Sequence, residues 1–163
     1  MVESFDTLEE MSIQGVYSKN CLDNGVTMMI ANPIQNLDDM PFPDWELLDM
    51  DVYTRSSTGR GRHLESKIAR REASLMTTRG CPFSCTFCAS HTVNGRSMRF
   101  RSVENVMAEI DLLHQKYGVN LFIPEDDLFT ANRKKVIPLL QELAKRHETI
   151  PGFELQFPNA LSV

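Results

Sequence analysis

Apolar residues recur at helical spacing between residues 102 and 118 and mark one face of a helix. That face consists of Val103, Val106, Met107, Ile110, Leu113 and Tyr117. Ser102, just before it, is a residue type that caps helix N-termini, and Gly118, just after it, is the type that ends helices. The pattern therefore predicts a helix between Ser102 and Gly118.

A second helical pattern follows Thr130, which we expect to be its N-cap. Its predicted inward face consists of Val136, Ile137, Leu140, Leu143, Ala144 and His147. Pro138 interrupts the pattern, because proline lacks an N–H and clashes with the preceding turn. We therefore expect either a kink at Pro138 or a helix that starts late.

Three apolar stretches of strand length alternate with these helices. They are "EASLMTT" (72–78), "VNLFIP" (119–124) and "FELQF" (153–157). The order strand, helix, strand, helix, strand predicts an α/β fold with a parallel sheet and right-handed crossovers. In such sheets the chemistry gathers at the carboxyl ends of the strands. A cysteine-rich loop follows the first stretch and the acidic run "EDD" follows the second, so both are expected there.

The part before residue 72 shows weaker patterns. "SIQGVYS" and "VTMMIA", within residues 12–31, predict a small hairpin or a sheet margin. "NPIQNLDDMPFPDWELLDMDVY" (32–53) contains three prolines and predicts an extended strap over a surface. The apolar side chains expected to dock it are Phe42, Trp45, Leu47 and Leu48. Residues 55–71 carry six Arg or Lys against one Glu, without interleaved aromatics, which favours a solvated loop over a nucleic-acid site.

Composition narrows the class of protein. With 163 residues, 42% of them hydrophobic, the chain can bury one core of ordinary size. The net charge of -5 argues against a protein built to bind nucleic acid. No apolar run approaches the roughly 20 residues of a membrane span, and no secretory signal is visible. Four cysteines, three of them clustered, favour a metal site in the reducing cytoplasm over a disulfide framework.

The cluster lies in "TTRGCPFSCTFCASH" (77–91), where Cys81, Cys85 and Cys88 can reach one metal centre. Zinc with His91 as fourth ligand and an iron–sulfur cluster both suit these soft ligands, and spacing alone does not separate them. No second CxxC is present, and Cys21 is expected to be a stray thiol. Three thiolates on a four-iron cluster would leave one iron open, as a catalytic site requires.

The run "CPFSCTFC" resembles the CxxxCxxC signature of the radical S-adenosylmethionine (radical SAM) superfamily. "RGCPFSCTFC" followed by "GRSMRFRSVENVMAEI" is similar to the subgroup paired with a cobalamin-binding domain. "PIQNLDDMPFPDWELLDMDVY" resembles that subgroup's connector, and "FIPEDDLFTANRKK" resembles its motif at the second strand. The resemblance spans about residues 30 to 160.

The resemblance implies that the three cysteines bind a [4Fe–4S] cluster whose free iron chelates S-adenosylmethionine (SAM). Reductive cleavage would then give a 5′-deoxyadenosyl radical. Phe87 takes the position that packs by the adenine, and Asp126 the position of an acid that binds the methionine amino group. Glu125 and Asp127 are close enough to take that role instead. From the residues alone, "EDD" is equally an acidic loop favoured by a helix dipole, and Arg99, Arg101 and Arg133 are expected on a solvated surface.

The resemblance also implies a partial (β/α) barrel, of which this chain would hold the first half. Its expected divisions are the remnant of a cobalamin-binding-like domain (1–31), a connector (32–72) and the N-terminal half of the barrel (73–163). The implied cofactors are the cluster, SAM and cobalamin, the last through a domain outside the chain. The implied partners are a small-molecule substrate and an electron donor such as flavodoxin or ferredoxin.

Three functions follow as hypotheses. The first is a cobalamin-type radical SAM enzyme that carries out methyl transfer or a rearrangement. The second is a methylthiotransferase-like enzyme that acts on RNA or protein. The third is a non-catalytic zinc module held by Cys81, Cys85, Cys88 and His91.

Overall fold

Three parallel strands form the main sheet, in the order β1–β4–β5. They are β1 (Glu72–Leu75), β4 (Leu121–Pro124) and β5 (Glu154–Leu155). The structure is a computed structural model that describes residues 32–55, 70–159 and 161. All but the first few of these residues belong to one unit, Gln35–Val163. The predicted α/β class with a parallel sheet is therefore confirmed.

The register of the strands sets which side chains enter the core. Ala73 lies opposite Phe122 in the β1–β4 pair, and Phe122 lies opposite Leu155 in the β4–β5 pair. Ala73 and Phe122 are buried in the core, and Leu155 packs against it. Because strand side chains alternate between faces, this row fixes the apolar face of the sheet.

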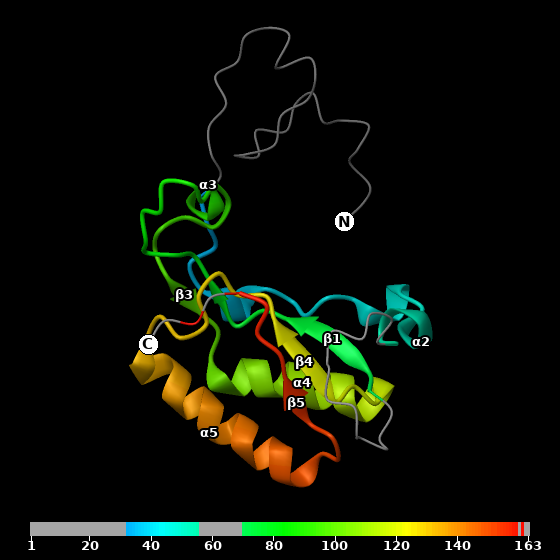
Figure 1. Cartoon of the computed structure of the whole chain (residues 1–163). Helices are drawn as coiled ribbons and strands as arrows, with labels where there is room; N and C mark the ends of the chain where they lie inside the picture. The colour runs from blue at the N-terminus through cyan, green and yellow to red at the C-terminus, as the bar shows by residue number, and fades with distance from the viewer. Residues whose placement is uncertain (1–31, 56–69, 160, 162–163) are drawn as a thin grey trace, which may run out of the picture. The chain divides into compact units, whose positions relative to one another are not determined.

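Two long helices, α4 (Val103–Tyr117) and α5 (Arg133–Thr149), cover the same face of the sheet (Figure 1). They bury Val106, Ile110, Leu113, Val136, Leu139 and Leu143 in one core with the strands. Each helix connects two neighbouring parallel strands, so both pack their apolar stripes against the same sheet face.

The predicted ends of α4 are confirmed. The Ser102 side chain accepts a hydrogen bond from Asn105 N, and Gly118 closes the helix in the left-handed conformation at φ 70°. The prediction for α5 was wrong by two residues, since Asn132 and not Thr130 provides the N-cap. Pro138 lies inside the helix, five residues after its start at Arg133, so the late start that would place the proline in the first turn is not observed.

The buried stripe of α5 differs from the predicted one. Val136 and Leu143 are buried as expected, but Leu139 replaces Ile137 and Leu140, which are exposed. The two-residue shift of the N-cap does not change which α5 residues share one side of the helix. The difference between the predicted and the buried residues therefore comes from which side of α5 the sheet and α4 cover. Ile137 and Leu140 are instead 45% and 40% exposed, and Leu140 lines a groove beside β5.

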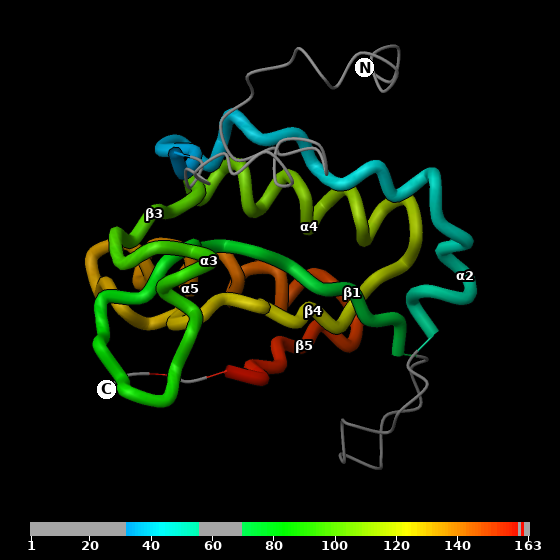
Figure 2. The backbone as a smooth tube through the Cα atoms, turned by 90° about the horizontal axis from the view of Figure 1, so that it is seen from above, coloured from blue at the N-terminus to red at the C-terminus, as the bar shows by residue number. Residues whose placement is uncertain are grey.

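Residues 35 to 53 run alongside α4 (Figure 2). This connector contains η2 (Leu37–Asp39), η3 (Trp45–Leu47) and α2 (Met50–Tyr53). Trp45 is buried and Phe42 partly buried, as predicted. Leu47 and Leu48 do not dock, with 82% and 45% of their surface exposed; Leu37 and Met50 are buried instead. Because the connector forms short helical turns, its side chains do not alternate between two sides as they would in an extended segment.

A second, two-stranded sheet stands at the carboxyl end of β1. Its strands β2 (Thr78–Arg79) and β3 (Arg99–Phe100) are antiparallel, and α3 (Ser90–Asn94) lies in the loop between them. The stretch 72–78 was predicted as one strand, but it divides between the two sheets before Thr78. The cysteine loop and α3 therefore form the connection between β2 and β3. The pairing of these two strands holds the two ends of that connection together.

Several predictions fall outside the described residues. They concern the hairpin within residues 12–31, Cys21 and all but the margins of the basic stretch 55–71. Within the described residues, none of the helices combines the length and apolar character needed to cross a membrane.

Candidate functional site

The three cysteines lie on a loop between β2 and α3, beyond the carboxyl end of β1. Cys85 is exposed, Cys81 and Cys88 are partly buried, and none of them is in a disulfide. A backbone hydrogen bond from Cys88 N to Cys85 O, at 3.2 Å, turns the chain between the last two. The position at the strand ends that the sequence predicted is thus confirmed for this loop.

The base of the loop is tightly packed at Gly80. A Cβ atom there would lie 2.3 Å from the backbone oxygen of Ser97, and φ is 97°. Only glycine meets both conditions without strain. Next to it, Cys81 N donates to Gly95 O at 3.2 Å, so the two arms of the loop are joined directly before the first cysteine.

Arg96 holds the stretch between Cys81 and Cys85. Its Nη1 donates to Phe83 O at 2.9 Å and to Ser84 Oγ at 2.7 Å. One guanidinium group therefore fixes the backbone just before Cys85 while leaving the cysteine side chains free.

The chemistry of this donor set fits an iron–sulfur cluster. Three soft thiols lie within eight residues on an exposed segment, and none is consumed by a disulfide. In the described part of the chain no three His, Cys, Asp or Glu side chains are already gathered around a metal position. His91, the alternative fourth ligand, lies in α3 and is partly buried.

Phe87, expected beside the adenine, has 91% of its surface exposed. It lies between Cys85 and Cys88 on the open part of the loop. An aromatic side chain of this size in water lacks a packing partner of its own, so it is free to stack on a planar ligand.

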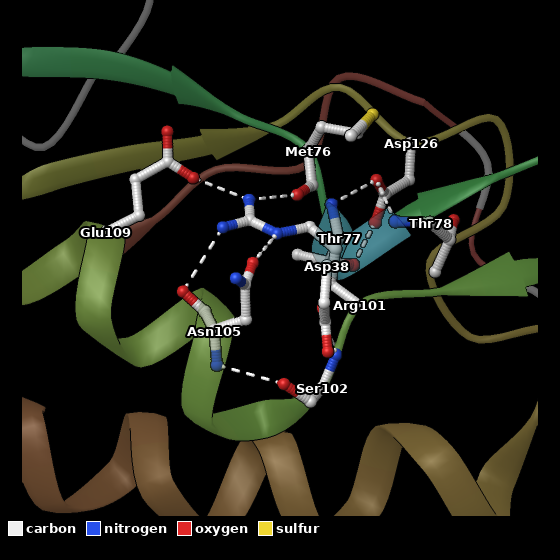
Figure 3. Close-up of polar contacts among 9 residues, drawn as sticks. All are labelled: Asp38, Met76, Thr77, Thr78, Arg101, Ser102, Asn105, Glu109 and Asp126. Carbon is white, nitrogen blue, oxygen red and sulfur yellow. Dashed lines mark hydrogen bonds and ion pairs between the residues drawn. The ribbon is translucent and has the colours of Figure 1, made fainter. Parts of the chain in front are cut away.

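Asp126, expected to contact the methionine amino group, accepts hydrogen bonds from Thr77 and Thr78 in the structure. It is 2% exposed, and its Oδ1 accepts hydrogen bonds from Thr77 N at 2.7 Å and Thr78 N at 2.8 Å. Its Oδ2 accepts from Thr77 Oγ1. Both oxygens accept hydrogen bonds from the protein and the side chain is buried, so Asp126 is not exposed to an incoming ammonium group (Figure 3).

Burial raises the pKa of the Asp126 carboxyl above its ordinary value. The hydrogen bonds from Thr77 and Thr78 and the nearby Arg79 guanidinium lower it and offset part of that rise. The cause is desolvation, which penalises the charged form of an acid.

The other two acids of "EDD" differ from Asp126. Asp127 Oδ2 accepts a hydrogen bond from Asn94 Nδ2 at 2.8 Å, at the end of α3. Glu125 is exposed and lines a pocket of about 340 Å³ between the connector and the carboxyl end of β1. Phe42, Trp45 and Arg79 contribute to the same pocket. Among the three acids, Glu125 is thus the one that faces open space.

Arg101 was expected on a solvated surface, but the side chains of Arg101 and Glu109 are only 5% and 4% exposed. Arg101 Nη1 pairs with Glu109 Oε2 at 2.5 Å and donates to Met76 O at 2.7 Å, while its Nε donates to Asn105 Oδ1 at 2.6 Å (Figure 3). Its guanidinium also lies 5.4 Å from the centre of the Phe42 ring. The group therefore holds the end of β1, α4 and the connector together.

The sequence contains a signal for this network that the prediction missed. Asn105 and Glu109 are four residues apart on α4, and Arg101 lies four residues before Asn105, just ahead of the Ser102 cap, so the three recur at helical spacing. Thr77, Thr78 and Asn94 carry no comparable signal, because their partners come from a distant loop.

The model of the family described as the radical SAM superfamily matches residues 75–156. An uncharacterized methyltransferase of Pyrococcus horikoshii is 39% identical over 106 residues, which are 65% of this chain and 20% of that protein. The anaerobic magnesium-protoporphyrin IX monomethyl ester cyclase of Rubrivivax gelatinosus is 34% identical over 114 residues, 70% of this chain and 18% of that protein.

Among solved structures, the chain is similar to the radical SAM methyltransferase TsrM of Kitasatospora setae, solved with cobalamin and a [4Fe–4S] cluster bound. The TM-score is 0.44 at 20% identity, covering 56% of this chain and 19% of that one. The chain spans about a fifth of the length of the curated relatives named above.

Proposed function

The chain belongs to the radical SAM superfamily, and from that premise we propose that it forms the cluster-binding part of an enzyme that cleaves SAM reductively. The observation that carries the proposal is the exposed loop of Cys81, Cys85 and Cys88. It lies at the carboxyl end of a parallel strand, within the residues that the family model matches, and its thiols are free.

In this proposal the three thiolates hold three irons of a [4Fe–4S] cluster. The bound cluster supplies the electron that breaks the S–C5′ bond of SAM. The chain leaves the fourth iron to SAM because it offers three thiolates and not four on this loop. Arg96 and Gly80 keep the loop backbone in place while the cysteine side chains converge.

Two side chains are proposed to bind SAM. Phe87 stacks on the adenine, which its full exposure beside Cys88 permits. Glu125 pairs with the methionine amino group, since it faces a pocket while the carboxylates of Asp126 and Asp127 are engaged within the protein. A carboxylate that meets an ammonium group in a partly dry pocket forms a charge-assisted hydrogen bond.

The fold is proposed to be the first half of a (β/α) barrel. Both helices cover one face of a parallel sheet, and β5 is its last strand among the described residues. A groove of about 450 Å³ beside β5 is suited to the next strand–helix unit. It is lined by Leu140, Leu143, Ala144, His147, Phe153, Glu154 and Leu155. The proposed divisions remain 1–31 for the cobalamin-binding-like remnant, 32–72 for the connector and 73–163 for the half-barrel.

The reaction is proposed to be methyl transfer to a small molecule, with rearrangement or ring closure as the other outcome. This proposal is supported by two relatives described above, of which one is named a methyltransferase and the other a cyclase. Cobalamin is proposed as a second cofactor because the connector resembles that of the cobalamin subgroup. An electron donor of the flavodoxin or ferredoxin type and a reducing cytoplasmic location complete the proposal.

The test is anaerobic reconstitution with iron and sulfide, followed by measurement of iron, sulfide and zinc per chain. We expect about four irons and four sulfides per chain and the brown colour of a cubane cluster. Cys85→Ala serves as the control and should lose the cluster. One colourless zinc per chain would support the zinc module and contradict the proposal.

A further inference from the structure

The two aspartates after β4 each hold one end of the cysteine loop. We propose that Asp126 and Asp127 are positioning residues that fix the two ends of this loop, and thereby set the environment of the metal cluster it binds. The inference rests on the proposed function, but it assigns these residues a role other than contact with SAM.

Asp126 holds the entry to the loop. Its Oδ1 accepts from the backbone N–H groups of Thr77 and Thr78, and its Oδ2 accepts from the Thr77 hydroxyl. Cys81 follows Thr78 by three positions. Hydrogen bonds to a buried carboxyl group are strong and directional, so the backbone leading to the first cysteine has little freedom.

Asp127 holds the exit. It accepts from the side-chain amide of Asn94, the last residue of α3. The same Asn94 accepts from Arg79 through Oδ1 at 3.3 Å and from Arg99 through its backbone oxygen at 2.5 Å. Asn94 therefore joins the loop exit to both β2 and β3 as well as to the loop after β4.

Between these two ends, the loop backbone is held by Arg96 and by local backbone hydrogen bonds, while the cysteine side chains themselves stay unpaired by disulfides. Residues 82–87 are all exposed, and no regular strand or helix is formed from Gly80 to Ala89. A metal cluster must draw three side chains together, and a loop with a held backbone and free cysteine side chains achieves this with a small loss of entropy. The two neighbouring aspartates thus couple the end of β4 to the position of the cluster.

The test uses the reconstituted 163-residue chain. The variants are Asp126→Ala, Asp126→Asn, Asp127→Ala, Asn94→Ala and the double variant of the last two. The readouts are the midpoint potential of the cluster, the electron paramagnetic resonance (EPR) spectrum of its reduced state, and the rate at which a chelator removes iron.

Asp126→Ala should release iron about tenfold faster and shift the potential, because three hydrogen bonds to the loop entry are lost. Asp126→Asn should restore most of the parent behaviour, since one amide oxygen can still accept from both backbone N–H groups. Asp127→Ala and Asn94→Ala should each act in the same direction, since both remove the Asn94–Asp127 hydrogen bond. Asn94→Ala also removes the acceptor of Arg79, so the double variant should add little to Asn94→Ala.

Asp111→Ala is the matched control. It removes two hydrogen bonds from Arg146, at 2.7 and 2.6 Å, between α4 and α5. It should lower the stability of the fold while the potential and the EPR spectrum stay those of the parent.

The parent chain tests the proposed function, and the Asp126→Ala variant tests the positioning role. A parent chain that assembles no iron–sulfur cluster overturns the proposed function and with it the purpose assigned to the aspartates. A parent that assembles it, with Asp126→Ala unchanged in potential, spectrum and iron release, overturns the positioning role alone. An Asp126→Ala variant that changes only as Asp111→Ala does would also overturn it.

Discussion

Replacing Glu109 by Gln should destabilise the fold far more than the same change at a surface ion pair. Glu109 and Arg101 are both almost fully buried, at 4% and 5% exposure. Removing one partner of a buried pair leaves an uncompensated charge and costs about 3–5 kcal/mol. Arg101 keeps three other acceptors, Met76 O, Asn105 Oδ1 and Asn105 O, so we expect the lower end, about 3 kcal/mol.

The matched control is Glu142→Gln. Glu142 pairs with Lys145 on the outside of α5 at 2.5 Å, where the two side chains are 36% and 63% exposed. An exposed pair of this kind contributes about 0.5 kcal/mol or less. Both variants remove one negative charge from a helical glutamate, so the change in net charge is the same.

Thermal unfolding followed by circular dichroism measures both variants. For a domain of this size, a loss of about 3 kcal/mol lowers the melting temperature by roughly 10 °C, against about 2 °C for the control. If Glu109→Gln were as stable as Glu142→Gln, the Arg101 network would not hold β1, α4 and the connector together.

Three further predictions concern the loop, the core and pH. Gly80→Ala should destabilise the chain clearly more than Gly95→Ala, which should cost about 1–3 kcal/mol for its positive φ alone, because a Cβ at Gly80 meets the backbone of Ser97 while one at Gly95 meets open space; equal unfolding midpoints would argue against the tight loop base. Phe122→Ala should cost about 3–5 kcal/mol in urea unfolding and Phe87→Ala almost nothing, since the first is buried and the second exposed; a large effect at Phe87 would place it in the core. The raised pKa of Asp126 means that its contribution to stability is present at low pH and is lost as the pH rises through the folded-state value. Asp126→Asn, which does not titrate, should therefore gain stability relative to the parent as the pH rises above about 4, the ordinary pKa of an aspartic acid, and a stability difference that stays constant with pH would contradict the burial effect.

The periodic parts of the fold were predictable from the sequence. The α4 stripe, its Ser102 cap and its Gly118 end follow from local rules and are confirmed. The α5 stripe was mostly wrong: Val136 and Leu143 are buried, but Ile137, Leu140, Ala144 and His147 are exposed, and the buried Leu139 was passed over. Which side of a helix is buried depends on where its neighbours lie, and that information is not local.

The candidate site was predictable in its cysteines but not in what surrounds them. The loop signature placed Cys81, Cys85 and Cys88 correctly at the end of β1. By contrast, the three acids of "EDD" look equivalent in the sequence, and only the fold separates Glu125 at a pocket from Asp126 and Asp127 in hydrogen bonds. Arg101 was expected in solvent because arginine is rarely buried without a partner. Its partner Glu109 lies two helical turns away.

EPR spectroscopy of the reduced, reconstituted chain, with and without SAM, tests whether one iron stays open to this cofactor. We expect the spectrum of a reduced cubane whose g-values shift when SAM is added, and no such signal from Cys85→Ala. A cluster whose spectrum is identical with and without SAM, or one that persists in Cys85→Ala, would contradict the assignment.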